Sequence, residues 1–245
     1  MDTRPIILIN GELDLANVPS LTLATRYASV IEAAGGLPLA LPPIAGEGYL
    51  DACLALADGV LLAGGDDFDT DAMGLGPTHA SAKPVTLEKQ NFDLELARKV
   101  MAADVPVLGI CYGMQLLALA DGGALLQHLP EDRPEAQVHS GGVTHSVQTL
   151  PGCKLEAHMG AASCQVTSRH HQALSLPGDS WAVAAVDEDG LIEAIERPEG
   201  HYAVGVQWHP ELTPEDAASQ NLFASFLHAA RERRERRQLD TISYA

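Results

Sequence analysis

The first half of the chain alternates short apolar runs with longer segments whose apolar residues recur every three or four positions. Apolar runs bounded by glycine or proline predict buried strands, and the helical spacing predicts amphipathic helices. The predicted strands cover residues 5–10, 37–41, 59–63 and 105–110, and the predicted helices cover residues 20–34, 47–57, 87–103 and 112–120. Strands that alternate with helices in this way indicate a parallel sheet with helices on its faces.

The second half has a different pattern, in which strand-like segments follow one another with short turns between them. These predicted strands cover residues 143–148, 165–168, 181–186, 191–196 and 202–208, and one helix over residues 214–237 closes the chain. We find no internal repeat and no low-complexity linker. The chain is therefore predicted to form a single α/β domain over residues 1–245, with a central, mostly parallel sheet flanked by helices and an additional region of antiparallel strands.

The charge of the chain narrows the choice of partners. It holds 15 basic against 33 acidic residues, which gives a formal net charge of −18 at pH 7. A field of this sign repels phosphate, which argues against nucleic acid and anionic membranes as partners. The exception is the stretch 231–237, with five Arg and two Glu, and the whole of residues 231–245 is predicted to be a basic, frayed C-terminal tail.

The apolar runs, the N-terminus and the cysteines together indicate a cellular compartment. The chain has no run of apolar residues long enough to span a membrane, and its N-terminus lacks the features of a secretory leader. The four cysteines are sparse and irregularly spaced, which favours free thiols over disulfides or a thiolate zinc site: Cys53, Cys111, Cys153 and Cys164. We therefore expect a cytoplasmic protein.

Residues 109–113 read Gly-Ile-Cys-Tyr-Gly, between a predicted strand and a predicted helix. The two glycines permit a sharp strand-to-helix turn that presents Cys111 as a nucleophile. The N-terminus of the helix would stabilise a thiolate there, and the N–H of Tyr112 is placed to bind an oxyanion. A buried structural cysteine in a tight turn explains the pentapeptide equally well, so both interpretations stay open at this point.

A cysteine nucleophile needs a base, and the candidate is His209, which follows the predicted strand 202–208. Because active sites of such sheets lie at the carboxyl ends of the strands, His209 is expected to face Cys111, with Glu211 orienting its ring. Gly65 ends another strand, where a glycine lets a second backbone N–H approach a substrate. Taken alone, each feature has an ordinary alternative, namely surface residues after a strand or a plain turn.

Five motifs together resemble those of the class I, or triad, glutamine amidotransferase superfamily, and within it the γ-glutamyl-γ-aminobutyrate hydrolase family most closely. They are Leu61–Asp66 (LLAGGD), Gly109–Gln115 (GICYGMQ), Ser168–Leu174 (SRHHQAL), Asp189–Glu196 (DGLIEAIE) and Gly205–Glu211 (GVQWHPE). The third and fourth motifs resemble the hydrolase branch in particular. The resemblance covers nearly the whole chain and implies a flavodoxin-like fold of the class I glutamine amidotransferase type.

This resemblance also implies roles for individual residues. Cys111 would be the nucleophile, His209 the general base and acid, and Glu211 the residue that orients His209. The backbone N–H groups of Gly65 and Tyr112 would form the oxyanion hole, and the γ-glutamyl group would lie near Gln115, His170, His171 and Gln172. The implied reaction hydrolyses a γ-glutamyl amide through a thioester and releases glutamate and an amine, with no metal or organic cofactor.

Two positions depart from the hydrolase branch, which usually has Arg where this chain has Tyr112 and Asn where it has Ala118. The string Cys-Tyr-Gly-Met-Gln is similar instead to that of GMP synthetase glutaminase domains. These departures leave the identity of the amine open. The predicted loop 66–86 carries four carboxylates, and if it borders the pocket it favours a cationic amine such as a polyamine, as in polyamine catabolism: Asp66, Asp67, Asp69 and Asp71.

Three functions therefore stay open. The first is a free-standing hydrolase of a small-molecule γ-glutamyl amide, and the second is a glutaminase subunit that supplies ammonia to a separate synthetase partner. The third is a catalytically silent binding protein of the same fold. The oligomeric state also stays open, with a homodimer among the options.

Two metal sites were considered and are not predicted. Asp67–Asp71 resembles the start of a calcium loop, but Ala72 and Thr78 stand where glycine and glutamate are needed. The histidines at 139 and 145, or those at 170 and 171, have no carboxylate or cysteine beside them at ligand spacing.

Overall fold

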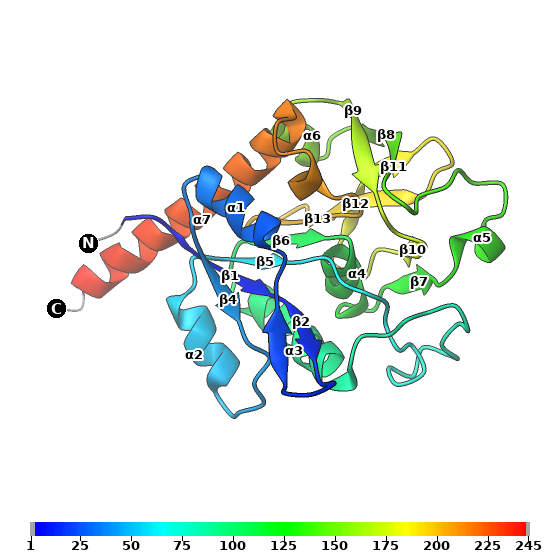
Figure 1. Ribbon diagram of the computed structural model, residues 1–245. Helices are drawn as coiled ribbons and strands as arrows, with labels where there is room; N and C mark the ends of the chain where they lie inside the picture. The colour runs from blue at the N-terminus through cyan, green and yellow to red at the C-terminus, as the bar shows by residue number, and fades with distance from the viewer. Residues whose placement is uncertain (1–2, 244–245) are drawn as a thin grey trace.

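The computed structural model describes residues 3–243, and their side chains through residue 239 (Figure 1). Its centre is an 11-stranded sheet in which nine strands follow the order β4-β1-β5-β6-β13-β12-β11-β8-β9, while β10 pairs with β12 and β7. The strands are β1 (Ile6–Asn10), β4 (Leu37–Leu41), β5 (Gly59–Leu62), β6 (Val107–Ile110), β7 (Ala124–Leu126), β8 (Val143–Thr149), β9 (Ser163–Ser168), β10 (Ala173–Leu176), β11 (Ala182–Asp187), β12 (Ile192–Glu196) and β13 (Ala203–Val206).

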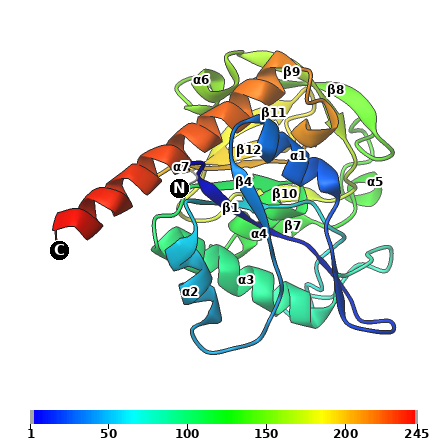
Figure 2. The same cartoon turned by 60° about the vertical axis from the view of Figure 1, so that its left-hand side comes forward.

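Helices cover both faces of the parallel half of this sheet (Figures 1 and 2). They are α1 (Thr25–Ala33), α2 (Tyr49–Leu56), α3 (Leu87–Ala102), α4 (Tyr112–Leu119) and α7 (Ala217–Ser243), and two short helices, α5 (Leu129–Asp132) and α6 (Leu155–Met159), lie in the second half of the chain. Within the described residues, no helix is both long and apolar enough to cross a bilayer.

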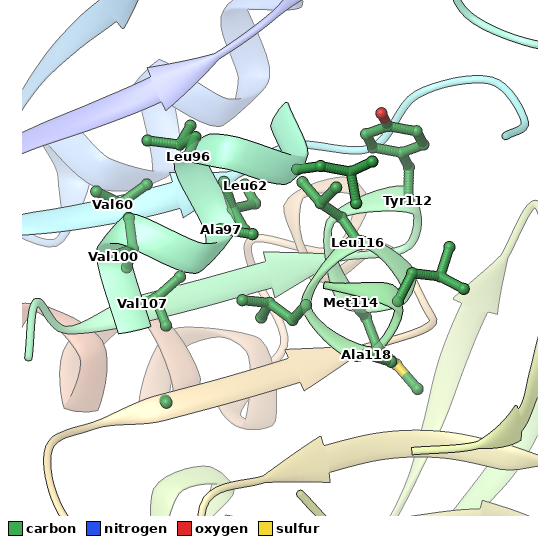
Figure 3. Packing of buried hydrophobic residues seen from close by; sticks show 14 of the residues in the cluster. Val60, Leu62, Leu96, Ala97, Val100, Val107, Tyr112, Met114, Leu116 and Ala118 are labelled. Atoms are coloured by element: carbon green, nitrogen blue, oxygen red, sulfur yellow. The ribbon is translucent and has the colours of Figure 1, made fainter. Parts of the chain in front are cut away.

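Alternating side chains of the parallel strands divide the core between the two faces, because successive residues of a strand point in opposite directions. Val60 and Leu62 of β5 belong to the core beneath α2, α3 and α4, whereas Leu61 belongs to the core beneath α1 and α7. Figure 3 shows the first of these cores, where Leu96 and Ala97 of α3 lie near Leu62 of β5. Both faces of β5 are therefore buried, as its continuous apolar run predicts.

Strand β13 joins the parallel and the antiparallel halves of the sheet. It pairs in parallel with β6 and antiparallel with β12. In the parallel pair, Val206 lies opposite Ile110, so the residues that follow both strands emerge at the same edge of the sheet. Cys111 follows β6 there, and Gln207, Trp208 and His209 follow β13.

The predicted fold class is confirmed, and the predicted helix over residues 20–34 is partly wrong. That helix begins only at Thr25, while Ser20–Thr22 forms strand β3, which pairs antiparallel with β2 (Glu12–Asp14) in a separate two-stranded sheet. The pairing brings Gly11 against Thr22, where a Cβ atom on Gly11 would lie 2.7 Å from the Thr22 carbonyl oxygen. The short strands β7 and β10 were also missed, because three or four residues carry too little periodicity.

The predicted helix over residues 214–237 is present as α7, which continues through residues 231–243; the expectation that residues 231–245 fray stays a prediction, and residues 244–245 lie outside the described part of the chain. Asp58 is fully buried, and its carboxylate binds Arg234 at 2.9 Å and Arg237 at 2.8 Å. A buried carboxylate requires such partners, because desolvation of a lone charge is costly. Arg234 and Arg237 thus tie this part of α7 to the residue before β5, and Figure 2 shows the last turns of the helix extending beyond the rest of the fold.

Candidate active site

The turn after β6 forces Cys111 into an unusual backbone conformation. Its φ of 52° and ψ of −107° lie outside the regions that most residues adopt, and it is the residue directly before α4. The flanking glycines make this turn possible. A Cβ on Gly113 would lie 2.1 Å from the Leu62 carbonyl oxygen, and one on Gly109 would lie 2.6 Å from the Gly113 carbonyl oxygen. The tight-turn geometry predicted from the pentapeptide is therefore present.

His209 and Glu211 form a tight pair after β13. Nδ1 of His209 lies 2.7 Å from Oε1 of Glu211, and the Glu211 side chain is almost completely buried. The His209 backbone N–H donates to the carbonyl oxygen of Thr167, which fixes the segment against β9. With Nδ1 directed at the carboxylate, Nε2 is the ring atom that remains for another partner.

His209 and Cys111 both lie close to Gly64. A Cβ atom on Gly64 would lie 3.0 Å from Cε1 of His209 and 3.8 Å from Cβ of Cys111, so both side chains flank this glycine. Burial by itself would lower the pKa of His209. The charge and hydrogen bond of a Cys111 thiolate, together with Glu211, outweigh burial and raise the pKa of His209 to about 10. The arrangement therefore favours the protonated form of the His209 ring.

Gly65 and Tyr112 lie next to each other at the turn that holds Cys111. Gly65 lies against Tyr112, since a Cβ on Gly65 would be 3.3 Å from Cγ of Tyr112. Within the described residues, the N–H groups of Gly65 and Tyr112 have no protein acceptor, whereas the N–H of Gly64 donates to the Tyr27 hydroxyl at 3.1 Å. Gly65 and Tyr112 thus leave two backbone donors without a protein acceptor near the N-terminus of α4, the end of a helix that carries partial positive charge.

The side chain of Tyr112 points away from this site. It is 1% exposed, stacks on Phe68 with ring centroids 4.3 Å apart, and donates its hydroxyl hydrogen to Oδ2 of Asp93 at 3.2 Å. Asp93 in turn binds Lys89 at 2.5 Å. The replacement of the family's usual Arg by Tyr112 therefore changes a buried packing contact, and only the Tyr112 backbone faces the sulfur.

A cavity of about 410 Å³ opens above Cys111. Its lining includes four of the predicted substrate-binding side chains, Gln115, His170, His171 and Gln172, and it also includes Gly65. Nε2 of Gln115 donates to the carbonyl oxygen of Gln172 at 3.2 Å. The structure thus brings the predicted substrate-binding residues to the cavity that Cys111 lines, with the Tyr112 side chain as the exception. His209 and Glu211 line a neighbouring cavity of about 420 Å³, which shares Gly65, Asp66 and Arg169 with the first.

The side chains that line the cavity carry charges of both signs. Only Asp66 and Asp67 of the four loop aspartates line it, and Asp67 accepts a hydrogen bond from Nε2 of His171 at 3.0 Å. That hydrogen bond raises the pKa of His171. Lys83 and Arg169 line the same cavity. The loop therefore borders the cavity through two of its four aspartates, whereas Asp69 accepts hydrogen bonds within the loop, from the Ala72 N–H and the Thr78 hydroxyl.

Gln207, Tyr27 and Glu193 are site residues that the sequence analysis missed. Gln207 lies within one of the recognised motifs, and its Nε2 lies 3.5 Å from Sγ of Cys111. In the sequence, Tyr27 shows only the apolar spacing of a helix, and this spacing does not indicate its contact with Gly64. The sequence shows no carboxylate at ligand spacing from the histidines. In the fold, Glu193 lies next to His139, His145 and His170, and His171 faces Asp67.

Comparison with known proteins defines the class. A glutamine amidotransferase of Thermotoga maritima, whose crystal structure is known, shares the fold with a TM-score of 0.60 and 15% identity over 95% of this chain and 97% of that one. Residues 5–211 match the family described as Peptidase C26. The chain belongs to the Peptidase C26 family, within the class I glutamine amidotransferase group, as the sequence motifs indicate.

Two curated relatives are similar along most of the chain. A protein of Mycobacterium tuberculosis that bears the provisional name of a glutamine amidotransferase is 33% identical over 237 residues, which cover 93% of this chain and 75% of that protein. The γ-glutamyl-γ-aminobutyrate hydrolase of Escherichia coli O157:H7 is 33% identical over 221 residues, which cover 85% of this chain and 86% of that protein. These relatives and the family support a hydrolase of the γ-glutamyl amide type.

Proposed function

We propose that the chain hydrolyses γ-glutamyl amides with Cys111 as nucleophile, His209 as general base and acid, and Glu211 as the residue that orients His209. One observation carries this proposal: the Glu211-bound ring of His209 and the strained Cys111 flank Gly64 at the same edge of the sheet. A nucleophile, a base and an orienting carboxylate in this order are the parts that covalent acyl transfer requires.

The first half of the reaction forms a thioester. The Cys111 thiolate bonds to the γ-carbonyl carbon, and the carbonyl electron pair moves to the oxygen, where the N–H groups of Gly65 and Tyr112 stabilise it. When the tetrahedral species collapses, the carbon–nitrogen bond breaks. His209 gives its Nε2 proton to the departing nitrogen, so the amine leaves neutral and a γ-glutamyl thioester remains on Cys111.

The second half of the reaction releases glutamate. His209, now neutral, takes a proton from a water molecule, whose oxygen bonds to the thioester carbon. The second tetrahedral species uses the same two backbone donors and collapses with cleavage of the carbon–sulfur bond. Glutamate leaves, the sulfur is again a thiolate, and His209 holds the proton of the starting state. These steps need only side chains, backbone and water, so the proposed mechanism uses no cofactor.

We infer that the substrate is γ-glutamyl-γ-aminobutyrate or a related γ-glutamyl amine. The name of the Escherichia coli relative supports this choice. Lys83 and Arg169 offer positive charge in the cavity, whereas Asp67 is already bound by His171. This balance suits substrate carboxylates at least as well as a second amine. The Gln115 and Gln172 amides lie in the same cavity, where they can contact the γ-glutamyl group.

A second candidate function is a glutaminase that delivers ammonia to a separate synthetase. The name of the mycobacterial relative favours it. The two functions differ in the leaving group, so one assay distinguishes them. Purified protein without partners is given γ-glutamyl-γ-aminobutyrate, γ-glutamylputrescine and glutamine, and glutamate release is measured as kcat/KM. Preference for a γ-glutamyl amine supports the hydrolase, preference for glutamine supports the glutaminase, and no release from any substrate supports a silent binding protein.

We also propose that the protein acts in the cytoplasm. Its four cysteines are free in the structure, and Cys111 has to remain reduced to act as a nucleophile. Fractionation of cells that express the chain at natural levels tests this location.

A further inference from the structure

A second cluster of chemically active side chains lies next to the cavity, in the antiparallel half of the fold. It consists of His139, His145, His170 and Glu193, and the nearest nitrogen and oxygen atoms of the four side chains all lie within 4.8 Å of one another. All four residues are buried, with Glu193 fully enclosed. They come from the loop before β8, from β8 itself, from the segment after β9 and from β12. None of them takes part in the chemical steps proposed for hydrolysis, although His170 also lines the cavity that Cys111 lines.

The three imidazoles are oriented alike. Nδ1 of His139 lies 2.9 Å from the carbonyl oxygen of Gln137, and Nδ1 of His170 lies 2.9 Å from that of Gln172. Nδ1 of His145 lies 3.2 Å from the carbonyl oxygen of the next residue. Because a carbonyl oxygen only accepts, each Nδ1 carries the hydrogen and each neutral ring directs the lone pair of Nε2 away from the backbone. Histidines that bind metal ions are held in this tautomer by the same kind of backbone contact.

The atoms that face one another in the cluster lack hydrogen-bond partners. Among the described residues, Nε2 of His139, Nε2 of His170 and both carboxylate oxygens of Glu193 are buried and have no hydrogen-bond partner. Oε1 of Glu193 lies 3.5 Å from the first of these nitrogens and 3.6 Å from the second, which is too long for a good hydrogen bond. An enclosed carboxylate without donors is costly. A cation bound between the imidazole nitrogens and the Glu193 carboxylate oxygens offsets the desolvation cost of that carboxylate.

Two neighbouring groups bear on what occupies the cluster. Oδ2 of Asp187 lies 3.0 Å from Nε2 of His139, without the alignment of a hydrogen bond. Oγ of Ser168 lies 2.7 Å from Nε2 of His145, and this hydroxyl has to rotate before His145 can bind a metal ion. The alternative to a metal ion is a proton on one of the rings, which would make an imidazolium beside Glu193 and Asp187.

We propose that His139, His145, His170 and Glu193 bind one divalent transition-metal ion of the zinc type. Three imidazole nitrogens and one carboxylate oxygen are donors that Zn²⁺ accepts, and buried imidazole favours such ions over Mg²⁺ or Ca²⁺. Four protein ligands in an enclosed position define a structural site, not one that presents a water molecule to a substrate. The proposal does not depend on the hydrolytic function.

The place of the cluster in the fold gives this site a role. The Gln172 carbonyl oxygen that accepts from His170 also accepts from Nε2 of Gln115. Gln115 Nε2 also donates to Oε1 of Gln207, and Gln207 contacts the Cys111 sulfur. A metal ion bound to His170 therefore holds the wall of the cavity in place through Gln172. Its removal is expected to loosen this wall and to lower the thermal stability of the fold.

The test measures metal binding directly, with untagged protein that carries Cys111→Ala. This substitution removes the thiolate that would otherwise take zinc together with His209. The protein is stripped with a chelator, and Zn²⁺ binding is measured by competition with a chromophoric chelator, with metal content by mass spectrometry and Tm by calorimetry. Glu193→Gln is added to the same background to remove one ligand, and His228→Gln, at an exposed histidine, serves as the matched control.

We expect one tightly bound Zn²⁺ per chain in the Cys111→Ala protein and in its His228→Gln derivative, with a higher Tm than in the stripped form. The Glu193→Gln derivative should lose at least tenfold in affinity and most of the Tm increase. If the Glu193→Gln derivative does not fold, the test is the visible absorption spectrum of Co²⁺ added to the stripped Cys111→Ala protein. Intense visible absorption of a four-coordinate ion supports the site. A weak six-coordinate spectrum overturns it, as does Zn²⁺ binding that is absent or unchanged by Glu193→Gln.

Discussion

Gln207 places its side-chain Nε2 3.5 Å from the sulfur of Cys111, while its Oε1 accepts a hydrogen bond from Gln115 at 3.1 Å. The second contact orients the amide, because it directs the Nε2 hydrogens toward the sulfur. Gln207 is fully buried, so water does not replace this donor. A donor held in this way stabilises a thiolate more than a thiol.

We expect Gln207→Leu to lower kcat/KM for a γ-glutamyl amide roughly tenfold to a hundredfold, as the loss of a hydrogen bond to a charged group predicts. Alkylation of Cys111 by iodoacetamide should slow in parallel, which separates an effect on the sulfur from one on substrate binding. Gln148→Leu, at an exposed position of β8, is the matched control. Unchanged alkylation and kcat/KM in Gln207→Leu would show that this contact has no part in activation.

Glu211→Gln should reduce kcat by about a hundredfold and leave KM nearly unchanged, because Glu211 orients His209 without touching the substrate. His209→Asn should reduce kcat further, since it removes the proton carrier itself. The exposed Glu215 provides the control substitution Glu215→Gln. Equal activity of Glu211→Gln and the wild type would remove Glu211 from the mechanism.

The pH dependence of stability follows from His209. Its pKa rises from 6.5 to about 10 in the folded protein, so the folded state binds the proton more tightly than the unfolded state. The resulting stabilisation is complete below pH 6.5 and is lost as the pH rises through 10. Urea unfolding at several pH values should therefore show the wild type losing stability over this range relative to His209→Gln. Parallel curves for the two proteins would contradict the raised pKa.

The elbow glycine Gly113 should tolerate no side chain. Gly113→Ala places a Cβ 2.1 Å from the Leu62 carbonyl oxygen, and we expect a loss of about 3 kcal/mol in the free energy of unfolding. Gly46→Ala is the control, because its Cβ would meet only Tyr49, at 3.7 Å. Denaturant unfolding compares the two variants. A Gly113→Ala protein as stable as Gly46→Ala would mean that β5 and α4 do not pack so closely.

The C-terminal helix should contribute to stability through Asp58. The double substitution Arg234→Ala and Arg237→Ala leaves this buried carboxylate without its two arginine partners, and we expect a loss of about 3 kcal/mol. Arg236→Ala, at an exposed position of the same helix, should have little effect. If thermal unfolding shows no difference between the double variant and Arg236→Ala, the tail is frayed as the sequence alone suggests.

Local sequence patterns predicted the parallel half of the fold. They also predicted that Cys111 and His209 lie at one edge of the sheet, because the carboxyl ends of parallel strands meet at the same edge. Features that depend on distant contacts escaped prediction. The strand Ser20–Thr22 exists because it pairs with Glu12–Asp14, and Arg234 of the C-terminal helix contacts Asp58, 176 residues away along the chain. Glu193 reaches the histidines only in the folded sheet, so no spacing rule could group them.

The most direct measurement is a search for the covalent intermediate. The protein is mixed with γ-glutamyl-γ-aminobutyrate, quenched in acid within the first turnovers, digested and analysed by mass spectrometry. We predict a γ-glutamyl group on Cys111 alone, absent from Cys111→Ala, which should also release no glutamate. A γ-glutamyl group on Cys53, Cys153 or Cys164, or turnover by Cys111→Ala within tenfold of the wild type, would contradict Cys111 as the nucleophile.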